Sequence, residues 1–182
     1  MIYSFITDSD LDVGMKKYFR DQITSAGTNI HILKTSEGAA FSMLKTKLNN
    51  KYDLVQLFPP IAEWTDSHVF SIGQYCSKAD VVYKASQGST NSAPDDPNSQ
   101  FWFISDPRDQ LLVILAVALT LYYFTESVNP RKLTQDLKNG FASAMEFLDD
   151  IKEGNENPDW PLLINGTSTI LWGANPTQNH YY

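Results

Sequence analysis

One predicted helix near the middle of the chain is apolar on every side. It covers residues 111–124 and follows a polar segment, residues 105–110. In that segment Asp106 can accept hydrogen bonds from the first free backbone N–H groups, Pro107 suits the first helical position, and Asp109 puts negative charge in the first turn. A helix that is apolar all round must be covered on all sides. Its fourteen residues fall short of the roughly 18 to 20 that span a bilayer, which favours a core helix over a membrane span.

Upstream of this helix, short runs of β-branched and aromatic residues alternate with segments of helical spacing. The runs predict strands, because turn and capping residues follow each of them. The predicted strands cover residues 2–7, 29–34, 53–58, 79–85 and 101–104, with helices over 11–26, 39–50 and 65–76 between them. Downstream, the spacing predicts an amphipathic helix over 133–151 and a β-hairpin over 162–172.

The alternation of strands and helices predicts an α/β fold. At 182 residues the chain suits a single domain, residues 1–182. Right-handed crossovers then favour an open, mostly parallel five-stranded sheet of the doubly wound class, with the flavodoxin-like strand order 2-1-3-4-5. The C-terminal helix and the short hairpin complete this predicted fold.

Two polar segments stand outside the predicted elements. Residues 86–100 are rich in Ser, Asn, Asp and Pro and contain almost nothing apolar, which predicts a flexible loop or a lid over a site. Residues 173–182 form a polar and aromatic C-terminal tail to which the pattern assigns no element.

Charge and cysteine content narrow the classes of partner. The net charge of −7 opposes attraction to nucleic-acid phosphates and to anionic lipid, so we expect neither a nucleic-acid nor a membrane partner. Cys76 is the single cysteine and cannot form an internal disulfide, which indicates a buried structural thiol. The first residues carry no basic signal region, and we expect a cytoplasmic protein.

The predicted sheet also locates a candidate site. In doubly wound sheets, ligands bind beyond the carboxyl ends of the strands. Acidic, hydroxyl and aromatic residues follow the predicted strands there, namely Asp8, Ser9, Asp10, Ser36, Glu63, Trp64, Asp66, Ser105 and Asp106. Helix capping alone would account for Asp10, Asp66 and Asp106. It does not account for Asp8 or Glu63, which the caps do not need.

Different chemistries fit these residues. Asp8 and Asp10 are a carboxylate pair that could hold Mg²⁺ through oxygen ligands. Glu63 and Asp66 flank Trp64 and could serve as catalytic carboxylates, for example at a glycosidic carbon. Ser9, Ser36, Trp64, Ser105 and Asp106 would then contact the ligand.

Two functions remain open at this point. The first is a small-molecule-binding protein, with a carboxylate-based enzyme as one form of it, whose ligand is nucleotide-like or contains a sugar. The second is a non-catalytic interaction module, an adaptor or inhibitor, whose acidic surface meets a basic protein or a second copy of the chain. A concave site with converging carboxylates and Trp64 would favour the first function, and a flat apolar patch would favour the second.

Overall fold

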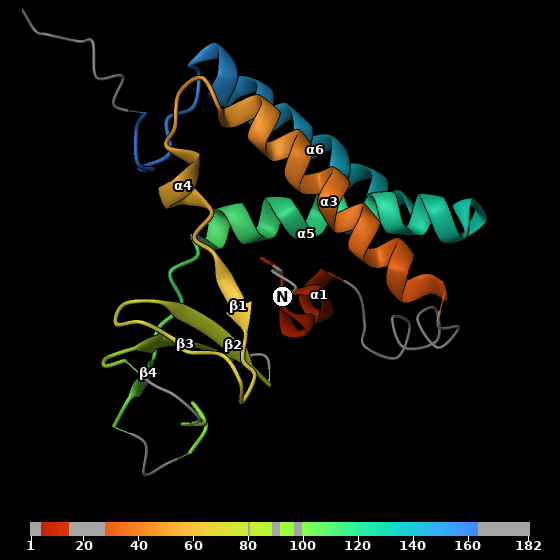
Figure 1. Ribbon diagram of the computed structural model, residues 1–182. Coiled ribbons are helices and arrows are strands. Elements are labelled where there is room, and N and C mark those ends of the chain that lie inside the picture. Colours follow the sequence, from red (N-terminus) through yellow and green to blue (C-terminus); the bar gives the residue numbers. More distant parts are fainter. Residues whose placement is uncertain (1–4, 15–27, 80, 89–91, 97–99, 164–182) are drawn as a thin grey trace, which may run out of the picture.

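The computed structural model describes residues 5–14, 28–79, 81–88, 92–96 and 100–163. Helices precede and follow one small sheet along the chain (Figure 1). The helices are α1 (Asp8–Gly14), α3 (Thr28–Leu48), α4 (Leu54–Leu57), α5 (Gln110–Val128), the 3-10 turn η1 (Pro130–Lys132) and α6 (Gln135–Glu153). The strands are β1 (Ile61–Glu63), β2 (Tyr75–Lys78), β3 (Val81–Ala85) and β4 (Trp102–Ile104).

Within the described residues, the sheet is mixed and has four strands in the order β1-β2-β3-β4. Only β1 and β2 run parallel, and the other two pairs are antiparallel. The prediction of a mostly parallel, doubly wound five-stranded sheet was therefore wrong. All four strands come from one continuous stretch, residues 61–104. The helices lie before and after that stretch, so they are not crossovers between its strands.

Residues 29–34, a predicted strand, instead form the first part of α3. The run of Ile and Leu there has high strand propensity, but tertiary packing overrides such local preferences. The long helix buries Ser36, Ala40, Leu44 and Leu48 along one side. Its hydroxyl side chains also donate to carbonyls one turn back, as Ser36 does to Ile32 at 2.8 Å.

Two further predictions fail between α3 and β2. Residues 53–58 form the single turn α4, because the Asp53 side chain accepts from the N–H groups of Val55 and Gln56 and so starts a helix. Residues 65–76, a predicted helix, contain turns and the start of β2. Gly73 has a φ of 84° there, which is outside the helical region.

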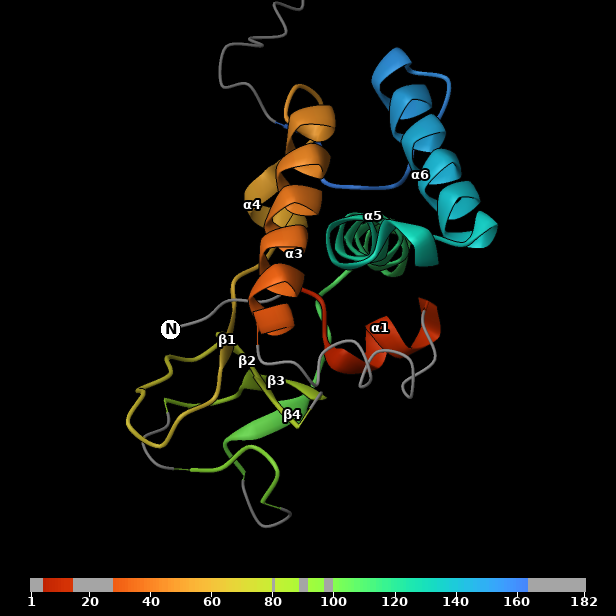
Figure 2. The same cartoon turned by 90° about the vertical axis from the view of Figure 1, so that its right-hand side faces the viewer.

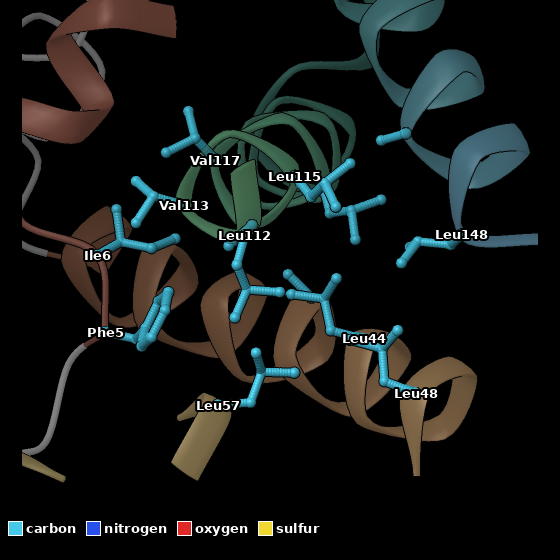
Figure 3. Packing of buried hydrophobic residues seen from close by; sticks show 14 of the residues in the cluster. Phe5, Ile6, Leu44, Leu48, Leu57, Leu112, Val113, Leu115, Val117 and Leu148 are labelled. Carbon is cyan, nitrogen blue, oxygen red and sulfur yellow. The ribbon is translucent and has the colours of Figure 1, made fainter. Parts of the chain in front are cut away.

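The central apolar helix is confirmed as α5. Its capping residue is Asp109, which accepts from the N–H of Leu112 at 3.0 Å, and not Asp106 as predicted; the helix continues to Val128, four residues beyond the predicted end. Helices α3 and α6 lie on either side of it and α1 lies below (Figure 2). Leu44 and Leu112 meet between α3 and α5, and Leu148 reaches in from α6 (Figure 3). Helices α1, α3 and α6 thus supply the cover that a helix of this pattern requires.

One side of α5 is less covered near its start. Ile114 is 62% exposed and Leu111 is 37% exposed. The length and composition of α5 would also suit a membrane span, but 56% of its apolar window is buried inside the protein. The packing on α1, α3 and α6 is that of a core helix.

The predicted strand over 2–7 was wrong in its described part, because residues 5–7 form a bend that leads into a helix. The helix predicted over 11–26 begins three residues earlier, as α1, and is described only to Gly14.

The amphipathic helix is confirmed as α6, which starts at the Thr134 cap and ends at Gly154 with a φ of 87°. Predicted strands 79–85 and 101–104 correspond to β3 and β4. Leu162 pairs with Tyr52 in an isolated bridge. The predicted hairpin and the 173–182 tail otherwise lie outside the described residues.

Two separate clusters of buried apolar side chains hold the described part together. The larger one joins the N-terminal segment and helices α1, α3, α4, α5 and α6. The smaller one lies within the sheet and includes Phe70, Cys76 and Trp102. Cys76 has no exposed surface, and burial raises the pKa of its thiol to about 12.

Substitution of Leu115 by Ala should lower the free energy of unfolding by about 2 to 5 kcal/mol, through lost burial and a residual cavity. Leu115 is 5% exposed, whereas its neighbour Ile114 points to solvent. Ile114→Ala is therefore the matched control and should cost less than about 1 kcal/mol. Denaturant unfolding of both variants measures the difference. Equal losses would contradict the orientation of α5.

Because Cys76 is the single cysteine, thiol alkylation reports on the sheet cluster alone. A thiol with a pKa of about 12 holds almost no reactive thiolate at pH 8. We expect the folded protein to resist iodoacetamide at pH 8 and the denatured protein to react fully, as followed by mass spectrometry. Rapid labelling of the folded protein would contradict the burial of this side chain.

Candidate functional site

An open groove of about 890 Å³ lies between the helices and the sheet. Its walls come from the N-terminal segment, one side of α3, the residues that lead into β1, and the ends of β1 and β2. Figure 2 shows the lower end of α3 above the sheet. This volume falls within the range of roughly 300 to 1,000 Å³ that is typical of ligand sites.

Aromatic side chains and prolines make the floor of the groove. The rings of Phe5, Phe41 and Phe58 lie within 5.2 to 5.4 Å of one another, in tilted and edge-to-face arrangements. Pro59 and Pro60 continue this surface toward Trp64. The groove therefore offers a ligand a rigid apolar surface.

Five charged residues of the described segments line the same groove: Lys34, Glu37, Lys45, Glu63 and Lys78. One carboxylate oxygen of Glu37 accepts from the N–H groups of Phe5 and Ile6, so this charge holds the N-terminal segment in place. The ammonium nitrogen of Lys78 lies 4.1 Å from the centre of the Trp64 ring and pairs with Asp95 at 2.6 Å. Lys45 lies 5.7 Å from the centre of the Phe58 ring.

The α3 part of the lining follows from one helical stripe. Lys34, Glu37, Phe41 and Lys45 recur at spacings of three and four, so they share one side of the helix. The predicted elements do not contain this stripe, because they divide the segment into a strand over 29–34 and a shorter helix over 39–50. A continuous helical pattern over residues 28–48 was the signal that would have placed these residues together.

Two predicted site residues, Asp10 and Asp106, instead bind Arg108. The side chain of Arg108 is 5% exposed and donates to Asp10 Oδ2 at 2.5 Å and to Asp106 Oδ2 at 2.6 Å. It also donates to the carbonyl of Phe5 at 2.6 Å. This ion-pair cluster ties the N-terminal segment to the start of α5.

Burial alone would raise the pKa of Asp106, but the hydrogen bonds and the charge of Arg108 outweigh it and hold that pKa below its usual value. Burial alone would likewise lower the pKa of Arg108, and the two carboxylates raise it. Asp106 and Arg108 are therefore both charged near neutral pH. Breaking the cluster would leave charges in a partly buried place.

The structure spreads the other predicted site residues apart. Glu63 and Trp64 both line the groove, whereas Asp66 is exposed in the turn after β1 and is not among the lining residues. The Ser36 hydroxyl donates to the carbonyl of Ile32 within α3. The Ser9 hydroxyl forms a hydrogen bond with the Thr7 hydroxyl at 2.9 Å. The N–H of Ser105 donates to the carbonyl of Val82 at 3.1 Å.

The predicted metal pair is only partly described. Asp8 opens α1, and its side chain lies outside the described residues. Asp10 uses one carboxylate oxygen for both Arg108 and the N–H of Thr7. Among the residues that the structure describes, no group of three or more His, Cys, Asp or Glu side chains could hold a metal ion. The magnesium site stays a prediction.

Comparison with known protein families, curated proteins and solved structures gives no match for this chain. The function must therefore be argued from the groove and its chemistry.

Replacing Arg108 by Met should lower the free energy of unfolding at pH 7 by about 2 to 3 kcal/mol. This loss is smaller than the loss for a fully buried ion pair, because the side chains of Asp10 and Asp106 keep some exposure. Arg131→Met, on an exposed side chain of η1, is the matched control and should stay within about 0.5 kcal/mol.

The same variant gives a pH dependence with a defined sign. Asp106 has a depressed pKa when folded, so its pairing with Arg108 stabilises the protein above the ordinary value of 3.8 and is lost as the pH falls through the folded value. The difference between wild type and Arg108→Met should thus shrink between pH 5 and pH 2, as measured by urea unfolding. A constant difference would argue against the ion pair.

Proposed function

We propose that this protein is a recognition module that binds an anionic ligand with an apolar part in the groove, without converting it chemically. The observation that carries the proposal is the pair Lys34 and Lys45 beside an aromatic floor, in a chain of net charge −7; the third lysine of the lining, Lys78, is already paired with Asp95. Since the rest of the chain repels anions, a local group of lysines selects where an anion binds.

The groove offers two kinds of contact to one ligand. Apolar surface comes from the rings of Phe41, Phe58 and Trp64. The wall formed by α3 also carries two lysines, Lys34 and Lys45. The carboxylate of Glu37 already bonds backbone N–H groups, and Glu63 is exposed. A nucleotide-like ligand would suit this arrangement, with phosphates near the lysines and the base against an aromatic ring.

Recognition is favoured over catalysis by the distribution of carboxylates. A carboxylate-based enzyme usually needs two acidic groups that face one substrate. Glu63 lines the groove, but Asp66 does not, and Asp10 and Asp106 bind Arg108. Glu37 uses one oxygen on the N-terminal segment.

Calorimetric titration with two anionic probes tests the proposal: ATP in the presence of EDTA, and an acetylated hexapeptide of alternating glutamate and valine. We expect at least one probe to bind, with an affinity that falls as salt rises. The double variant Lys34→Glu/Lys45→Glu should weaken that binding by at least about tenfold, the equivalent of 1.4 kcal/mol.

The matched control is Lys138→Glu/Lys152→Glu, which changes the net charge equally at exposed positions of α6 outside the groove. It should leave the affinity within about twofold, an effect well below 1 kcal/mol. Failure of both probes to bind, or equal losses in the two double variants, would overturn the proposed function.

A further inference from the structure

The edge of the sheet opens into the groove. Strand β1 is at one end of the strand order, and β2 is its only neighbour among the described strands. Ile61 and Glu63, the first and last residues of β1, both line the groove. One wall of the groove is therefore an unpaired strand edge.

The register of β1 shows which backbone groups lie on that edge. Trp64 donates its N–H to Ser77 of β2 at 2.9 Å. In a parallel pair, alternate residues direct their N–H and C=O groups to the same side. Ala62 and Trp64 thus face β2, whereas Ile61 and Glu63 direct theirs away from it. Within the described part of the chain, these outward groups have no hydrogen-bond partner.

We propose that the occupant of the groove is an extended acidic segment of a partner protein, which pairs with β1 as an additional strand. This inference rests on the proposed function and names the class of its ligand. Addition of a strand to a free sheet edge supplies backbone hydrogen bonds, and side-chain contacts supply the specificity.

Charge and spacing support such a segment. Lys34 and Lys45 are eleven residues apart on α3, which is roughly 16 Å along a helix. An extended chain covers that length in about five residues at roughly 3.3 Å each. Acidic side chains on one side of the segment would face the lysines, and the alternate side chains would face the aromatic floor.

The open edge also distinguishes a peptide from a nucleotide. A peptide presents N–H and C=O groups at the repeat of a strand, which matches the groups of Ile61 and Glu63. A nucleotide has no such repeat and would leave part of the edge unpaired. Buried backbone groups without partners are costly, so the edge favours a polypeptide.

The test uses the full-length chain and the alternating glutamate-valine hexapeptide, followed by calorimetry. Two further hexapeptides carry N-methyl groups on either the odd or the even residues, which removes one alternate set of N–H donors. Strand addition predicts that one methylated peptide loses at least about tenfold in affinity while the other stays within about threefold, since only one set faces β1.

A protein variant tests the same edge. The N–H of Glu63 points away from β2, so Glu63→Pro removes an outward donor and leaves the β1–β2 ladder intact. This variant should lower the affinity for the hexapeptide by at least about tenfold. The control Glu63→Ala removes a like charge and should not weaken it. A melting curve checks that both variants fold. If Glu63→Pro does not fold, the methylated peptides still test strand addition with the wild-type protein.

The outcomes separate the two proposals. Binding of the hexapeptide with equal sensitivity to both methylation patterns, or binding of ATP alone, would overturn strand addition and leave the proposed function standing. A doubling of molecular mass in the absence of peptide, abolished by Glu63→Pro, would identify a second copy of the chain as the occupant and also overturn it. If neither probe binds, both proposals fail.

Discussion

The need to cover α5 on several sides organises the described structure. No single helix can bury an element that is apolar all round, so α1, α3 and α6 surround it from segments far apart in the sequence. Both α3 and α6 place an apolar side against α5 and turn a polar side outward. The sheet is formed by the stretch between α4 and α5 and has its own small buried cluster. Its strands therefore need not pass between the helices, as they would in a doubly wound fold.

Arg108 connects this helical core to the N-terminal segment. It lies just before α5 and binds Asp10, Asp106 and the carbonyl of Phe5. An arginine can satisfy several acceptors at once because its guanidinium group carries five donors in a fixed plane. Since Phe5 contributes to the groove floor, the ion-pair cluster helps to position one wall of the candidate site. The acidic residues that suggested a ligand site in the sequence thus have a structural role nearby.

Elements with a strong pattern could be predicted from the sequence, and those decided by tertiary contacts could not. Helices α5 and α6 have long, consistent patterns and clear caps, and both were predicted along with β3 and β4. Residues 29–34 have strand propensity, yet they begin α3, where Ile32 and Leu33 pack partly buried against the helical core. Of the predicted site residues, Glu63 and Trp64 do line the groove. The lysines were missed because their common stripe exists only if residues 28–48 form one helix.

The groove and the strand edge are consequences of the same arrangement. The four strands form from one stretch of chain between α4 and α5, and β1 is the first strand in the sheet order. A short link with two prolines joins α4 to β1 and places β1 beside α3. Natural sheets usually protect a free edge by charge, by proline or by a covering element. Here Pro59 and Pro60 precede β1, and Glu63 ends it. These features discourage indiscriminate pairing, and the facing lysines of α3 would admit an acidic strand in preference to a neutral or basic one.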